Sequence, residues 1–320
     1  MARNDEHAPD PPENVEAQAE GDRVGDSNIL NPPDESDVAR VLQNIDVVLA
    51  NDQLRAKDAG VLHASEVTTE PRALRDVVHG SCFDAGEIMG LPATLEQLIG
   101  TERLAFFRQV ALVPCDLGPL VPEMSPGDDV VVLVHGFMAS AGVFRPLRAR
   151  LEREAGVRVA TFTHAPGAGV RRIARQLARL VDTLPRGGRM TIAGHSLGGV
   201  VARWFVQEMG GDARVAQTIS LASPFHGVAV PPMLVGADVH ERSDLLHRLR
   251  ERAPACRVPH TSIVAGSDTI VAGTRTASLG VGDVVVLPNR GHNALLFDSE
   301  AADHVIDRVK QRGMRIPPPL

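Results

Sequence analysis

Residues 190–199 have the sequence Met-Thr-Ile-Ala-Gly-His-Ser-Leu-Gly-Gly. The apolar residues at its start predict the end of a short buried strand, and residues 200–209 predict a helix that follows directly. Residues 194–198 between them fit the pattern G-x-S-x-G, in which a serine lies on a sharp turn from strand to helix. Such a turn pushes the hydroxyl out of the sheet edge, and the flanking glycines relieve the crowding. We therefore predict that Ser196 is a catalytic nucleophile.

The same turn predicts one side of an oxyanion hole. The first backbone N–H groups of a helix are unpaired and carry the positive end of the helix dipole, so Leu197 is the expected first donor. The second donor should come from the loop after the first core strand, at residues 135–140 (His-Gly-Phe-Met-Ala-Ser). Gly136 allows a sharp backbone path there. Phe137 is our choice for the second donor, and Met138 is the alternative.

Around these stretches, the pattern of the chain predicts the fold class. From residue 126 onward, short apolar runs alternate with helical periodicity, which is typical of an α/β protein with a mostly parallel sheet and helices on both faces. Further strands are expected at residues 129–134, 157–162, 215–221, 261–265 and 281–287, and helices at residues 141–155, 170–184 and 299–310. Aromatic residues make up 3% of the chain, so the core must be aliphatic. We predict one catalytic domain at residues 126–320.

A serine nucleophile needs a base, and the base needs a carboxylate that orients it. Asp268 and His292 each follow a predicted strand, at the edge where parallel sheets place their sites, and in the order that this motif requires. They are our choices for the acid and the base. Four other aspartates are less favourable candidates for the acid, because none of them follows a core strand on a loop of its own: Asp238, Asp244, Asp283 and Asp298.

Several histidines are expected near the serine without acting as the base. His135 is predicted to brace the oxyanion loop, and His195 to pack beside the nucleophile. His226 follows a core strand and is the second choice for the base. Together with Gly136 and Met138, these histidines are the predicted lining of the substrate pocket.

Four motifs in this order carry a family resemblance: residues 134–137 (Val-His-Gly-Phe), 193–199 (Ala-Gly-His-Ser-Leu-Gly-Gly), 266–271 (Gly-Ser-Asp-Thr-Ile-Val) and 291–292 (Gly-His). Together they resemble the lipases and esterases of the α/β-hydrolase superfamily, and most of all the small bacterial triacylglycerol lipases. The resemblance covers residues 126–312. It implies hydrolysis of lipid or acylglycerol esters through an acyl-enzyme, as part of lipid metabolism, without a cofactor. Hydrolysis of a thioester, an amide or a lactone, and a non-catalytic binding role, stay open as alternatives.

The remaining segments predict further domain organisation. Residues 1–37 hold eleven acidic residues against two arginines, which predicts a disordered acidic tail. Residues 38–125 predict a helical N-terminal extension that packs on the catalytic domain, with helices expected at residues 38–49, 71–79 and 92–110. Residues 228–258 interrupt the alternation of predicted strands and helices. They predict either a lid that forms one wall of the acyl pocket or an ordinary surface insertion. Their basic amphipathic helix is also compatible with transient contact with a membrane surface.

Charge and composition limit the partners. The net charge is −7 for the chain and −9 for residues 1–37, so the rest is near neutral at +2 and gives no reason to expect a nucleic-acid partner. The three cysteines lack metal-site spacing, so no metal site is expected. No apolar run is long enough to span a bilayer, and no secretory signal is recognised, so a cytoplasmic location is expected. The sequence does not indicate an oligomeric state.

Overall fold

The computed structural model describes residues 100–229 and 237–311. The predicted acidic tail and most of the predicted extension lie outside these ranges, as do residues 230–236 of the insertion. The predicted domain boundary at residue 126 therefore stays a prediction. Within the described ranges, no helix is both long and apolar enough to cross a membrane.

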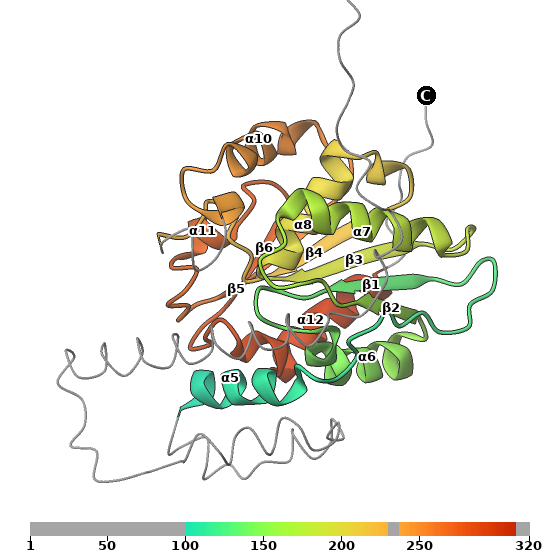
Figure 1. Ribbon diagram of the computed structural model, residues 1–320, viewed down its shortest axis with the longest axis horizontal. Helices are drawn as coiled ribbons and strands as arrows, with labels where there is room; N and C mark the ends of the chain where they lie inside the picture. The colour runs from blue at the N-terminus through green and yellow to red at the C-terminus, as the bar shows by residue number, and fades with distance from the viewer. Residues whose placement is uncertain (1–99, 230–236, 312–320) are drawn as a thin grey trace, which may run out of the picture.

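A six-stranded sheet forms the centre of the molecule, with the strand order β2-β1-β3-β4-β5-β6 (Figure 1). All five neighbouring pairs are parallel. The strands are β1 (Val130–Val134), β2 (Arg158–Phe162), β3 (Met190–His195), β4 (Gln217–Leu221), β5 (His260–Ala265) and β6 (Asp283–Leu287). Every residue of β1 and β3 is buried, as a central strand covered on both faces requires. The predicted α/β fold is thus confirmed.

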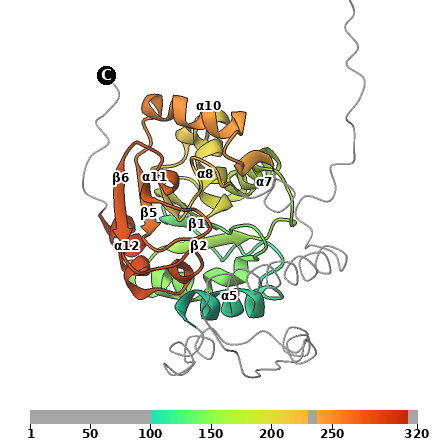
Figure 2. The same ribbon diagram turned by 90° about the vertical axis from the view of Figure 1, so that its left-hand side faces the viewer.

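Helices cover both faces of this sheet (Figures 1 and 2). One apolar layer packs α7 (Val170–Thr183) and α8 (Leu197–Glu208) on the sheet, and α10 (Asp244–Arg252) packs against α8. The opposite layer holds α5 (Thr101–Leu112), α6 (Arg145–Arg150) and α12 (Ser299–Lys310). A short helix, α11 (Thr274–Ala277), follows β5. Single turns complete the described elements: η1 (Ala141–Phe144), η2 (Leu151–Ala155), η3 (Gly211–Ala213), η4 (Ala237–Val239), η5 (Ala253–Ala255) and η6 (Ala294–Leu296).

Some predicted helices differ in detail from the observed ones. The helix expected at residues 141–155 is three consecutive pieces, η1, α6 and η2, which end at Gly156 in the left-handed region. The helix expected to start at residue 200 begins at Leu197, directly after the serine. The helix expected at residues 92–110 overlaps α5, whose described part packs against η6.

Close backbone contacts explain the two glycines of the G-x-S-x-G pattern. A Cβ atom at Gly198 would lie 1.9 Å from the Val134 carbonyl oxygen of β1. At Gly194 a Cβ atom would lie 2.3 Å from the Gly198 carbonyl carbon. Both distances are far below van der Waals contact, so the start of α8 can approach β1 and β3 only because these residues lack side chains.

Substituting Gly198→Ala should therefore destabilise the protein, by about 3 kcal/mol, because the added methyl group must displace backbone atoms of β1. The free energy of unfolding in urea measures this. Gly118→Ala is the matched control, since a Cβ atom at Gly118 would meet nothing within 4 Å. It should change stability by less than about 0.5 kcal/mol. Equal effects of the two substitutions would contradict the packing argument.

Candidate active site

Ser196 lies on the turn between β3 and α8 with a strained backbone. Its φ is 51° and its ψ is −120°, in a region that non-glycine residues rarely adopt. The Ser196 N–H donates a hydrogen bond of 2.8 Å to the Leu221 carbonyl at the end of β4, which anchors the turn to the sheet. The residue is partly exposed. Strain of this kind is found where a fold holds a reactive side chain in place.

Asp268 and His292 form a buried pair at the ends of β5 and β6. His292 Nδ1 donates to Asp268 Oδ2 at 2.8 Å, and their side chains are 5% and 0% exposed. The second carboxylate oxygen, Oδ1, accepts from the backbone N–H groups of Ile270 at 2.8 Å and Val271 at 2.7 Å. Both oxygens of Asp268 are thus held, and the imidazole is oriented with its Nε2 available for a proton.

His195 links the serine turn to the loop that carries His292. Its Nε2 donates to the His292 carbonyl oxygen at 3.1 Å, and the two rings are 4.9 Å apart between centroids. Burial is the main cause that lowers the pKa of His195 to about 3, with a contribution from the His292 ring. His195 is therefore a neutral residue that joins the predicted nucleophile to the predicted base.

The loop after β1 lies against the serine. A Cβ atom at Gly136 would be 3.0 Å from the Ser196 Cβ and 3.0 Å from His195 Nδ1, so a side chain at this position would be crowded by the serine turn. Among the described residues, the N–H groups of Phe137 and Leu197 donate to no other residue. Met138 has a positive φ of 55°. Phe137 and Leu197 stay our predicted oxyanion donors, with Met138 as the alternative to Phe137.

His135 and His164 brace this loop as a stacked pair with ring centroids 3.8 Å apart. His135 Nε2 accepts from the His164 N–H at 3.1 Å, so the proton of this ring is on Nδ1, which donates to the Gly136 carbonyl at 2.8 Å. His164 Nε2 donates to the His135 carbonyl at 3.2 Å. Burial holds the pKa of His135 well below its ordinary value and lowers that of His164 to about 4.

The buried histidines should make the protein acid-labile below pH 6.5. His164 is neutral in the folded protein, with a pKa of about 4, whereas in the unfolded chain it titrates near 6.5. As the pH falls from 6.5 to 4, the unfolded state takes up this proton first. The free energy of unfolding should then drop by up to about 1.4 kcal/mol per pH unit for each such histidine.

Urea unfolding of wild type and of His164→Gln at several pH values between 7 and 4.5 measures this effect. The glutamine can keep a donor near the His135 carbonyl, and it does not titrate. The slope of unfolding free energy against pH should therefore be smaller in the variant by about 1.4 kcal/mol per unit. Parallel slopes for the two proteins would contradict a buried neutral His164.

His226, the alternative candidate for the base, has other partners. His226 is half-buried, and its backbone N–H donates to the Thr276 carbonyl. Burial lowers its pKa, with added contributions from Arg250 and Arg275. Within the described ranges, its ring makes no hydrogen bond to a carboxylate.

The rival aspartates likewise have structural roles. Asp238 accepts from the Val170 N–H at the start of α7, at 2.7 Å. Asp298 caps α12 and pairs with Arg290, while Asp283 pairs with Arg308. Asp244 is the first residue of α10. The described contacts therefore favour Asp268 as the partner of His292.

Two polar residues of α5 reach the site and were not predicted from the sequence. Glu102 accepts hydrogen bonds from the backbone directly after His292, and Gln109 donates to the Met138 carbonyl. No motif marks either residue, because Glu102 contacts residues 191 positions later in the chain.

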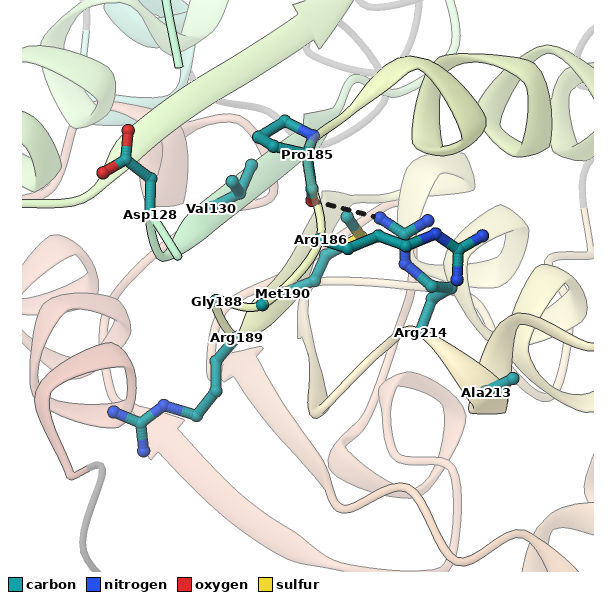
Figure 3. Close-up of a pocket in the computed structure, with 10 residues that line it drawn as sticks. Asp128, Val130, Pro185, Arg186, Gly188, Arg189, Met190, Ala213 and Arg214 are labelled. Atoms are coloured by element: carbon teal, nitrogen blue, oxygen red, sulfur yellow. Dashed lines mark hydrogen bonds between the residues drawn. The ribbon is translucent and has the colours of Figure 1, made fainter. Parts of the chain in front are cut away.

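A cavity of about 230 Å³ lies at the opposite end of the sheet (Figure 3). Its lining includes Val130 and Met190, the first residues of β1 and β3, whereas the serine turn follows the last residue of β3. Arg214 spans part of it and donates to the Pro185 carbonyl at 3.3 Å. This cavity is therefore separate from the candidate catalytic centre. Among the described residues, no group of three or more His, Cys, Asp or Glu could hold a metal ion.

Comparisons with known proteins agree with this architecture. Residues 130–266 match the family model described as palmitoyl protein thioesterase. The structure is similar to that of the metagenome-derived lipolytic enzymes LipS and LipT, with a TM-score of 0.50, 16% identity, and coverage of 61% of this chain and 97% of that chain. For the monoacylglycerol lipase of Paleococcus ferrophilus the TM-score is 0.48, with 15% identity and coverage of 60% and 99%. No curated protein matches the sequence.

At such low identity, structural similarity indicates the fold and not the substrate. The parallel sheet, the serine turn after β3 and the match at residues 130–266 agree with the resemblance drawn from the sequence motifs. This chain has the α/β-hydrolase fold.

Proposed function

We propose that this protein is a serine hydrolase that cleaves carboxylic esters, of the lipid or acylglycerol type, through an acyl-enzyme. The observation that carries the proposal is the buried Asp268–His292 pair, 2.8 Å apart, joined through His195 to a serine in a strained turn. This arrangement has a nucleophile, a base and an orienting acid, each on a separate strand end. A serine in a merely structural turn needs neither of the other two.

In the proposed cycle, His292 Nε2 takes the Ser196 proton as Oγ attacks the ester carbonyl carbon. The backbone N–H groups of Leu197 and Phe137 donate to the resulting oxyanion. The carbon–oxygen bond to the alcohol then breaks, and the imidazolium returns its proton to the leaving oxygen. Water attacks the acyl-enzyme in the same way, which releases the acid and regenerates Ser196. Asp268 holds the imidazole in the correct tautomer and stabilises its protonated form.

Thioester hydrolysis is the second candidate, and the match to the palmitoyl protein thioesterase family favours it. The same residues would act, and a thiol would leave in place of an alcohol. A thiolate leaves more readily than an alkoxide, so protonation by His292 matters less in that reaction. The two substrates would therefore use the same catalytic residues, but they differ in how far the leaving group depends on protonation by His292 and in the pocket that receives it.

Matched pairs of oxygen esters and thioesters with the same acyl chain test this choice. kcat/KM should be measured for both series as the acyl chain lengthens, with Ser196→Ala as the blank. Preference for oxygen esters at every length would support the ester reading. A preference for thioesters that is larger than their greater intrinsic rate of hydrolysis would show instead that the protein is a thioesterase. Absence of Ser196-dependent turnover on either series would overturn the proposal.

The described part of the insertion at residues 228–258 bears on the predicted membrane contact. In α10, Leu245, Leu246 and Leu249 are buried, and Gln207 of α8 donates to the Leu249 carbonyl at 2.9 Å. The apolar side of this helix therefore faces the domain and not the solvent, which weakens the prediction that it contacts a membrane. The absence of a cofactor, of a metal and of a nucleic-acid partner, and the cytoplasmic location, remain predictions.

A further inference from the structure

We propose that α5 positions both sides of the catalytic centre, with Glu102 as the positioning residue for His292. This inference rests on the proposed function, because it assigns a role to a residue in the same reaction. The residue that it concerns lies apart in the chain from the proposed nucleophile, acid and base. Glu102 precedes β1 and lies outside the segment that matches the thioesterase family, residues 130–266.

The carboxylate of Glu102 binds the backbone that follows His292. The Asn293 N–H donates to it at 2.8 Å (Oε1) and 3.1 Å (Oε2), and the Ala294 N–H donates to Oε2 at 3.0 Å. The Asn293 side-chain amide adds a fourth contact at 2.9 Å. These N–H groups lie at the start of the turn η6. The first N–H groups of a helical turn have no hydrogen-bond partner within the turn itself. Glu102 therefore caps this turn from a distant segment with charge-assisted hydrogen bonds.

The residue before His292 is also shaped by this carboxylate. A Cβ atom at Gly291 would lie 2.2 Å from Glu102 Oε2, so only a glycine leaves room for the carboxylate here. Glu102 thus touches the chain immediately before His292 and immediately after it. The backbone of His292 is fixed on both sides by one side chain of α5, in addition to the hydrogen bond that its carbonyl accepts from His195 Nε2.

The second half of α5 holds the loop that carries the predicted oxyanion donor. Gln109 Nε2 donates to the Met138 carbonyl at 3.3 Å. At the end of the helix, the Ser140 hydroxyl approaches the carbonyl oxygens of Leu112 and Cys115, both at 2.9 Å. Gly142 packs against Leu112 so closely that a Cβ atom would lie 2.4 Å from its carbonyl oxygen. One helix therefore contacts both the base loop and the oxyanion loop.

Such contacts matter because catalysis depends on small distances. Catalytic groups must be held within about 0.5 Å of their productive positions, and a displacement of about 1 Å can reduce the rate by about 100-fold. Removal of the Glu102 carboxylate would leave the N–H groups of Asn293 and Ala294 without their partner. The loop would then relax, and His292 would move relative to Ser196 and Asp268.

Glu102→Ala tests the role. Glu123→Gln is the control for loss of one carboxylate, at an exposed position that also precedes β1 in the chain. With the best ester substrate, Glu102→Ala should lower kcat by about 10- to 100-fold and change KM by less than about threefold. Glu102→Gln keeps one acceptor oxygen and should recover part of the loss. Glu123→Gln should match the wild type. An unchanged kcat in Glu102→Ala would overturn the inference.

A second readout does not depend on turnover. The proton on His292 Nδ1, shared with Asp268, should give a downfield proton NMR resonance, assigned by its loss in His292→Ala. Glu102→Ala should shift or broaden this resonance, and Glu123→Gln should not. If Glu102→Ala fails to fold, as judged by circular dichroism, Glu102→Gln decides the question by the same measurement. An unmoved resonance would count against positioning, even if the protein lacked Ser196-dependent hydrolysis and the proposed function had failed.

Discussion

Ser196→Ala is expected to lower kcat for ester hydrolysis by about 10⁶-fold and to abolish labelling by a fluorophosphonate probe. The reason is that the alanine has no oxygen to form the acyl-enzyme, so the remaining groups can assist only a direct attack by water. The folded structure should persist, because the contact that anchors the turn is made by the Ser196 backbone N–H and not by its hydroxyl.

Ser125→Ala is the matched control, since Ser125 is an exposed serine in the loop before β1. It should retain both activity and labelling. The measurement is single-turnover kinetics with a chromogenic ester, together with probe labelling of the pure proteins. If Ser196→Ala kept the activity of the wild type, Ser196 would not be the nucleophile, and the proposed function would fall with it.

Asp268→Asn should lower kcat by about 10⁴-fold with little loss of stability. In the wild type, the N–H groups of Ile270 and Val271 donate to Oδ1, while His292 donates to Oδ2. The asparagine must place its oxygen opposite the two backbone donors, which turns its NH₂ group toward His292 Nδ1. The imidazole then carries its proton on Nε2, and it cannot accept a proton from Ser196.

The pH profile of kcat/KM and the rate of fluorophosphonate labelling should both report this loss. Asp212→Asn, at an exposed aspartate of η3, controls for the removal of one negative charge and should leave both unchanged. A loss of less than about tenfold in Asp268→Asn would mean that another carboxylate orients the base.

Local patterns in the sequence were sufficient to predict the serine turn and to choose a candidate acid and base. Residues 190–199 encode a buried strand, two glycines and a helix start, and the structure shows that both glycines are required by contacts under 2.5 Å. Asp268 and His292 could be chosen because parallel strands end at one edge of a sheet, so residues that follow such strands meet there. The hydrogen bond between them is in accord with that choice.

Other parts of the site had no local signal. The stacked pair of His135 and His164 could not be derived from two separate histidines, and their lowered pKa values arise from burial, which the fold creates. The same is true of α10, whose basic amphipathic pattern suits a membrane surface as well as it suits the α8 face on which its leucines pack. Periodicity shows that a face is apolar but does not show what covers it.

The sequence by itself determined the parallel α/β architecture and the serine turn, because each follows from the period of apolar residues or from a short motif whose geometry is local. It also predicted the acid and the base. Only the tertiary structure decided how these groups are held. Glu102 lies 191 residues before the backbone that it caps, and Gln109 lies 29 residues before the carbonyl that it binds. Hydrogen bonds of this kind form between segments that the chain brings together only on folding, so no local pattern records them.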